Sequence, residues 1–241
     1  EVLQVLQILN HPLKVREISH KNYRYKKLER AKEILVLFLH MPCGKQDHAV
    51  LSGEVNSAKL ALELTLSMCS RVAIIDPHPE RDWFSFSKRI DLLSMVPKLL
   101  EEIDLRFESP MLLAPDEGAQ RKWGLSGFGK RRISSEKAVV LGEAPLAERV
   151  VFLDDLILSG GTLKRVRRHA LKSGVEFFGA AATHALPLVD SEENLRNLVN
   201  EFEENLIVTN TVPSKTFLKD YPKLCLDCTD LISSYLEELS L

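Results

Sequence analysis

The stretch "VVFLDDLILSGGT", residues 150–162, decides the fold of this chain. Four apolar residues lead into two adjacent aspartates, and a glycine turn precedes a helix-like segment. The apolar run is typical of a buried strand, and backbone N–H groups of a glycine turn at a helix start can hold a phosphate. Asp154 and Asp155 could accept hydrogen bonds from two ribose hydroxyls, or hold a magnesium ion indirectly. The simpler alternative is a strand, a polar turn and a helix without a ligand.

Short apolar runs alternate with helical patterns along the rest of the chain. This alternation predicts an α/β fold with mostly parallel sheets covered by helices. We expect strands within 33–41, 71–78, 109–118, 149–156, 176–184 and 205–211, and helices within 53–70 and 159–174. Polar pairs follow four of the strands, namely Asp76 and His78, Asp116 and Glu117, Asp154 and Asp155, and Thr183 and His184. Ligands gather at the carboxyl ends of strands in such sheets, so these pairs predict a site there.

The bulk composition excludes several classes of protein. The 241 residues are 45% hydrophobic and 27% charged, which gives ample material for a core. A net charge of −2 gives no reason to expect a nucleic-acid or membrane partner, and no apolar run approaches the roughly 20 residues of a membrane-spanning helix. Cys225 and Cys228 lack the second ligand pair of a zinc site, so we interpret them as reduced thiols of a cytoplasmic protein. Because the chain starts at Glu1 inside a helix-like stretch, we expect part of the natural protein to precede it.

Three further segments carry candidate chemistry, each with a simpler alternative. Asp76 and His78 suit a hard divalent metal or a phosphate, or they are a helix cap beside an exposed histidine. The segment "APDEGAQRK" (114–122) is a second phosphate loop or a turn into a helix. The segment "GFGKRRISSEK" (127–137) is a solvated basic loop, or a mobile flap that closes over a polyphosphate and neutralises its charge.

Taken in order, these segments resemble the ribose-phosphate diphosphokinase family, also called phosphoribosyl-diphosphate synthetases. The opening stretch matches the phosphoribosyl-diphosphate motif, and "GKQDHAVLSGEVNSAKLALEL" (44–64) resembles the family's Arg-Gln-Asp segment and Ser-Ala-Lys helix. "VAIIDPH" (72–78) resembles the Asp-x-His strand end, 114–122 the Pro-Asp-x-Gly segment, and "GKRRI" (129–133) the Lys-x-Arg flap. The resemblance spans roughly residues 30 to 235 and is nearest in wording to the divergent plant-type branch.

The resemblance implies two phosphoribosyltransferase-like α/β domains. Residues 1–105 would form the ATP and metal side, incomplete at its start, and 106–241 the ribose 5-phosphate side, with the C-terminal helix able to pack back on the first domain. The implied reaction transfers the diphosphate of ATP to ribose 5-phosphate, which gives 5-phosphoribosyl diphosphate and AMP. The family also implies Mg²⁺, a homo-oligomer and a cytoplasmic location.

The resemblance assigns a role to each matching residue. The ribose 5-phosphate site would comprise Asp154, Asp155, Leu158, Ser159, Gly160, Gly161 and Thr162. ATP would contact Lys45, Gln46, Asp47 and His78, and the metal would bind Asp76, His78 and Asp116. Lys130 and Arg132 would stabilise the transition state.

Several departures from the family pattern leave other functions open. Lys45 stands where the family usually has arginine, and Pro77 stiffens the link between Asp76 and His78. The family's first strand and Phe-Pro-Asp-Gly-Glu loop, which completes a neighbouring subunit's adenine pocket, have no counterpart, and residues 11–30 match nothing. One alternative is therefore a catalytically weak regulatory paralogue that assembles with active subunits. Another is a phosphoribosyltransferase that consumes the activated sugar, although that function leaves the 45–47 and 76–78 matches unexplained.

Overall fold

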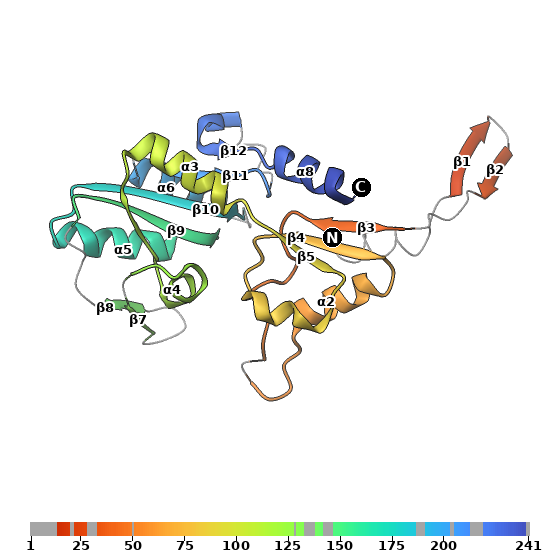
Figure 1. Ribbon diagram of the computed structural model, residues 1–241, viewed down its shortest axis with the longest axis horizontal. Helices are drawn as coiled ribbons and strands as arrows, with labels where there is room; N and C mark the ends of the chain where they lie inside the picture. The colour runs from red at the N-terminus through yellow and green to blue at the C-terminus, as the bar shows by residue number, and fades with distance from the viewer. Residues whose placement is uncertain are drawn as a thin grey trace. The chain divides into compact units, whose positions relative to one another are not determined.

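The computed structural model contains two parallel sheets with covering helices and two antiparallel strand pairs (Figure 1). It describes residues 14–19, 22–27, 33–49, 51–127, 129–132, 138–141, 147–186, 191–202, 205–212 and 219–239. The chain divides into two compact units, Glu1–Leu93 and Ser94–Leu241. The domain boundary expected at 105/106 falls inside a helix, Val96–Phe107, that packs on the sheet of the second unit.

The first unit contains a parallel sheet in the strand order β3-β4-β5, with one helix between β3 and β4. A separate antiparallel pair, β1 and β2, precedes it. Val72 and Ile74 are buried on the face of β4 that packs against Ala58 and Leu62 of the helix. The elements are β1 (Lys14–Ser19), β2 (Asn22–Lys27), β3 (Leu35–Phe38), α2 (Ser57–Leu66), β4 (Arg71–Ile75), η1 (Arg81–Phe86) and β5 (Ile90–Leu93).

The second unit contains a five-stranded parallel sheet in the order β12-β11-β10-β9-β6. Two further strands, β7 and β8, form an antiparallel pair outside this sheet. Its helices and main-sheet strands are α3 (Val96–Phe107), β6 (Met111–Leu113), α4 (Glu117–Trp123), β9 (Arg149–Ile157), α5 (Gly161–Lys172), β10 (Phe177–Ala185), α6 (Ser191–Glu201), β11 (Leu206–Thr209), η2 (Pro222–Leu224), β12 (Cys225–Leu226) and α8 (Thr229–Leu239). The pair outside the sheet is β7 (Gly129–Arg132) and β8 (Ala138–Leu141).

The five-stranded sheet is buried on both faces, which explains its near-continuous apolar strands. Successive side chains of a strand point to opposite faces. Phe152 of β9 accordingly belongs to the core cluster with Val166 of α5 and Leu198 of α6. Its neighbour Leu153 belongs to the cluster with Ile103 of α3 on the other face. Each such fully buried side chain contributes about 1.5–3 kcal/mol.

The predicted α/β class is confirmed, and each of the six expected strands overlaps an observed strand. The expected strand within 109–118 shrinks to Met111–Leu113 because Pro110 and Pro115 flank it, and proline has no N–H for a sheet ladder. The sequence did not single out strand β5, Ile90–Leu93. None of the helices that the structure describes combines the length and hydrophobicity needed to cross a bilayer.

Candidate active site

The opening stretch forms the end of β9, a tight turn and the start of α5. Asp154 and Asp155 are the sixth and seventh of the nine residues of β9, and α5 begins at Gly161. Gly160 has φ of 69°, a conformation that favours glycine, and a Cβ at this position would lie 3.0 Å from Leu198 Cδ1. Glycine is therefore required twice, by the backbone and by the packing of α6. The turn presents the first amides of α5 at the carboxyl edge of the sheet, an arrangement that suits a phosphate.

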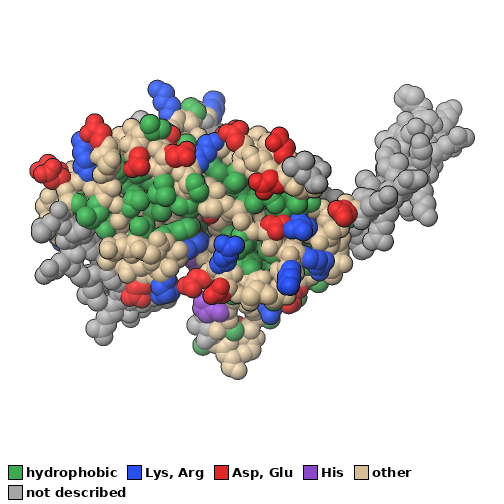
Figure 2. All heavy atoms as spheres, in the orientation of Figure 1, with side chains coloured by type: hydrophobic (Ala, Val, Ile, Leu, Met, Phe, Trp, Pro, Cys, Tyr) green, Lys and Arg blue, Asp and Glu red, His purple; other side chains and the backbone are tan. Residues whose placement is uncertain are grey.

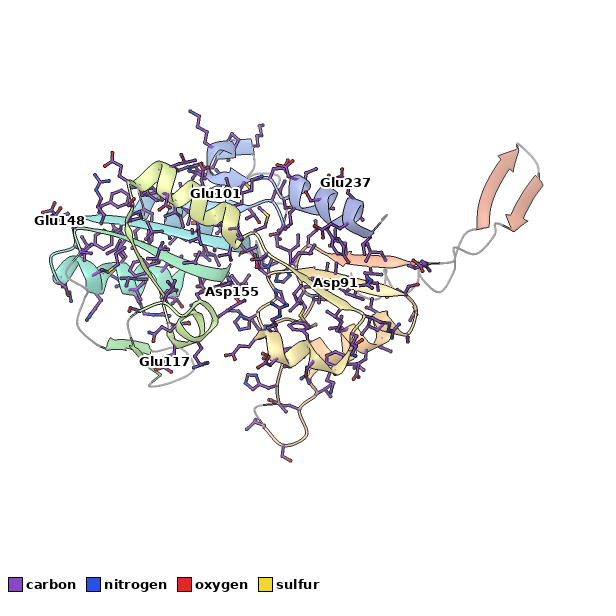
Figure 3. The ribbon with its side chains drawn as sticks, viewed as in Figure 1. Asp91, Glu101, Glu117, Glu148, Asp155 and Glu237 are labelled. Atoms are coloured by element: carbon purple, nitrogen blue, oxygen red, sulfur yellow. The ribbon has the colours of Figure 1, made fainter. Side chains whose placement is uncertain are left out.

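Asp155 is held by a buried ion pair with Lys122. Lys122 Nζ donates to Asp155 Oδ2 at 2.8 Å, and the two side chains are only 14% and 8% exposed. Lys122 lies in the last turn of α4 and also sits over the Trp123 ring, 4.9 Å from its centroid. Figure 3 labels Asp155 on β9 and Glu117 at the start of α4. The Lys122 cation therefore neutralises the negative charge of Asp155 without a ligand.

Asp116, which the sequence predicted as a metal ligand, caps helix α4. Its Oδ1 accepts hydrogen bonds from the N–H groups of Gly118 at 3.1 Å and Ala119 at 3.2 Å. The segment 114–122 thus turns into helix α4, and its interpretation as a second phosphate loop stays a prediction. The side chain of Lys122, in the last turn of this helix, contacts Asp155.

Asp154 is half-buried and carries an unusual proton affinity. Burial raises the pKa of Asp154 from 3.8 to about 8, and the neighbouring charges of Asp155 and Asp116 raise it further. Its Oδ1 accepts the Asp155 N–H at 2.9 Å. At neutral pH without a ligand, Asp154 is mostly protonated, whereas an approaching cation or hydroxyl donor would favour its ionised form.

The buried Lys122–Asp155 pair should contribute to the stability of the folded protein. Lys122→Met should destabilise the protein by about 3–5 kcal/mol, because it leaves a buried carboxylate without its cation. Urea unfolding followed by circular dichroism measures this loss. The matched control is Lys164→Met, which removes the more exposed Lys164–Glu201 pair at 3.7 Å and should cost under about 1 kcal/mol. If both variants lose the same free energy of unfolding, the buried pair contributes no more to stability than the exposed pair.

The first unit brings two of the predicted segments together. Gly44, next to Lys45, lies near the 76–78 segment, where a Cβ on it would be in ordinary van der Waals contact with the Cβ of His78, at 3.6 Å. Asp76 is buried directly after β4 with φ of 35°, a strained conformation for a residue other than glycine, and its N–H donates to Leu93 O at 3.0 Å. Lys45 and His78 are exposed. The carboxyl end of β4 therefore lies beside the segment that the sequence assigned to ATP.

Not every predicted site residue can be placed in the same way. Lys130 and Arg132 lie in β7, where they pair with Val140 and Ala138 of β8 in an antiparallel ladder, and their side chains lie outside the described part of the structure. Asp76 and His78 belong to the first unit and Asp116 to the second. Across the described ranges, no three His, Cys, Asp or Glu side chains converge into a metal-binding group.

Known proteins are similar to this chain over most of its length. A ribose-phosphate pyrophosphokinase from Sulfurisphaera tokodaii is 28% identical over 195 residues, which cover 75% of this chain and 66% of that protein. One from Aquifex aeolicus is 28% identical over 208 residues, which cover 80% of this chain and 65% of that protein. The chain is therefore similar over most of its length to proteins named ribose-phosphate pyrophosphokinase. This similarity bears out the resemblance predicted from the sequence, and the chain spans about two thirds of the length of these curated relatives.

The fold of the ribose-phosphate pyrophosphokinase family also recurs among solved structures. A crystal structure of phosphoribosylpyrophosphate synthetase from Mycobacterium smegmatis matches with a TM-score of 0.70, covering 98% of this chain and 93% of that one. At 18% identity, this likeness shows a common fold. No protein-family model matches the chain.

Proposed function

We propose that the protein is a ribose-phosphate diphosphokinase. In this reaction the anomeric hydroxyl oxygen of ribose 5-phosphate attacks the β-phosphorus of ATP. The bond from that phosphorus to the oxygen bridging the α-phosphate breaks, AMP leaves, and the hydroxyl proton passes to solvent or to a base. Such a transfer needs positioning and charge neutralisation more than a protein nucleophile.

The observation that carries the proposal is the packing of Gly44 against His78 in the first unit. An enzyme that only consumes the activated sugar needs the Asp154–Thr162 stretch of the second unit and nothing more. Here a second parallel sheet brings the 45–47 and 76–78 segments together at the end of β4. Two sites, one for each substrate, favour a synthetase over a phosphoribosyltransferase.

In this proposal, the second unit binds ribose 5-phosphate. Asp154 accepts hydrogen bonds from the ribose hydroxyls, since it lies beside the turn while Lys122 pairs with its neighbour Asp155. The turn amides and hydroxyls hold the 5-phosphate at the N-terminus of α5. That turn comprises Leu158, Ser159, Gly160, Gly161 and Thr162. Asp155 is paired with Lys122 and so holds the end of β9 against α4.

The first unit binds ATP, in the same proposal, through Lys45, Gln46, Asp47 and His78. Mg²⁺ keeps several waters and is usually held by one or two carboxylates together with substrate phosphates. In the first unit, Asp76 at the end of β4 and His78 are the residues that would hold such an ion, and the metal role of Asp116 stays a prediction from the sequence. Mg²⁺ would neutralise phosphate charge, and Lys130 and Arg132 would add positive charge at the transition state.

The test is AMP release by the full-length protein. With MgCl₂, ATP and ribose 5-phosphate we expect equal amounts of AMP and 5-phosphoribosyl diphosphate, and no AMP when ribose 5-phosphate is omitted. A well-folded protein that releases no AMP contradicts the proposal. If that protein instead alters the activity of a catalytic paralogue, the regulatory alternative is correct.

Two features of location and assembly belong to the same proposal. We expect the enzyme to act in the cytoplasm, on soluble metabolites, as a homo-oligomer without nucleic-acid or membrane partners. Acidic and basic side chains are interspersed on the visible face in Figure 2. Light scattering of the purified protein measures its assembly.

A further inference from the structure

The main-chain carbonyl of Asp47 accepts hydrogen bonds from two side chains that come from different elements. Trp83 Nε1 of η1 donates at 2.9 Å, and the carboxamide nitrogen of Asn56, just before α2, donates to the same oxygen. These donors are 36 and 9 residues away from Asp47 in the sequence. The segment that carries Lys45 and Gln46 is thus fastened at its end by both neighbouring elements.

The backbone of the segment is held at further points. Gln46 N–H donates to Cys43 O at 2.8 Å, and Gln46 O accepts the Ala58 N–H at 3.2 Å. The side chains of Lys45 and Gln46 nevertheless remain exposed. A fixed backbone that presents exposed polar side chains is suited to bind a ligand, because most of the ordering entropy is lost during folding and not during binding.

Both donors are themselves rigid. Trp83 makes edge contacts with the rings of Phe84, which is buried, and Phe86, at centroid distances of 4.8 and 5.7 Å. Asn56 Oδ1 accepts the Lys59 N–H at 2.8 Å and so caps α2. Because η1 follows the Asp76–His78 segment within a few residues, the Trp83 indole also links that segment to 45–47.

We infer that Trp83 and Asn56 are positioning residues for ATP. Their shared acceptor, the Asp47 carbonyl, sets the place of Lys45 and Gln46 relative to His78, and hence the fit of the ATP phosphates. The inference rests on the proposed function, since it assumes that ATP binds to the first unit. Neither residue was predicted from the sequence to belong to the site.

The test uses two variants that each remove one donor. Trp83→Phe keeps an aromatic ring on Phe84 but has no N–H. Asn56→Asp keeps the acceptor that caps α2 but has no amide hydrogens. In each variant, the KM and the dissociation constant for MgATP should rise by about tenfold or more, because small misplacements of binding groups are costly. The kcat and the KM for ribose 5-phosphate should change less than about twofold, since those substrate contacts stay intact.

The matched control is Asp91→Asn in the same unit. Asp91, labelled in Figure 3, pairs with Arg71 at 2.7 Å at the start of β4, whereas Asp76 follows its end. This variant loses an ion pair but should keep the wild-type affinity for MgATP. If it weakens MgATP binding as much as the two test variants do, the effect is general destabilisation and the inference is wrong.

The remaining outcomes separate this inference from the proposed function. If the wild type releases AMP and both variants bind MgATP like the wild type, the inference fails and the function stands. If the wild type binds MgATP but releases no AMP, the function fails, and the two dissociation constants still decide the role of Trp83 and Asn56. A wild type that binds no MgATP overturns both.

Discussion

Lys130→Ala should lower kcat by about 10²- to 10³-fold, the loss seen when one preorganised transition-state donor is removed. Diphosphoryl transfer spreads negative charge over the phosphate oxygens, and Lys130 belongs to the basic β7 strand that we propose covers them. The KM for ribose 5-phosphate should change by less than about threefold, since a transition-state contact adds little to ground-state binding. Initial rates of AMP release at varied ribose 5-phosphate give both constants.

Two variants control for simple loss of charge. Lys172→Ala removes an exposed lysine from the end of α5 and should keep the wild-type kcat. Lys130→Arg keeps the charge in a different shape and should recover part of the activity. If Lys130→Ala raises the KM for ribose 5-phosphate as much as it lowers kcat, Lys130 contributes to substrate binding and the flap role is wrong.

The local features of the second unit could be predicted from the sequence because local chemistry fixes them. A left-handed turn at Gly160 requires glycine, and the run before Asp154 fits only a strand covered on both faces. The motif therefore identified both the strand end and the helix start. The extents of elements were less predictable, as the shortening of β6 between two prolines shows.

The contacts that hold the candidate sites could not be predicted in this way. Lys122 and Asp155 are 33 residues apart, and nothing in a single sequence separates a lysine that binds phosphate from one that neutralises a buried aspartate. The bond from Trp83 to the Asp47 carbonyl joins a side chain to a backbone atom 36 residues away, so no residue type at position 47 signals it. Both depend on which elements the sheet topology places side by side.

Asp154→Asn should separate the stability of the protein from its function. In the wild type the pKa of Asp154 is about 8 in the folded state and near 3.8 in the unfolded state. Between pH 4 and 8 the unfolded chain loses this proton while the folded chain keeps it, so the wild type loses stability as the pH rises. The asparagine variant has no such proton and should be more stable at pH 8 by about 5 kcal/mol, but about equally stable at pH 4.

Asp227→Asn is the control of opposite sign. Hydrogen bonds from Thr229 and Asn210 lower the pKa of Asp227 to about 2, so its carboxylate stabilises the folded state above pH 4 and this contribution is lost as the pH falls towards 2. Asp227→Asn should therefore lose stability at neutral pH, where Asp154→Asn gains it. Urea unfolding of both variants at pH 2, 4, 6 and 8 measures the two trends.

The Asp154→Asn variant should be less active than the wild type, although it is more stable. An amide cannot accept the ribose hydroxyls with a full negative charge, so kcat/KM for ribose 5-phosphate should fall by about 10²-fold, while the KM for MgATP stays unchanged. If the variant is more stable but uses ribose 5-phosphate less well, the carboxylate of Asp154 lowers the stability of the folded protein and is retained because it binds the sugar. A variant with wild-type kcat/KM would contradict the assignment of Asp154 to the ribose, whatever its stability. A stability gain that does not depend on pH would instead contradict the raised pKa, because only a proton held by the folded state alone produces the pH dependence.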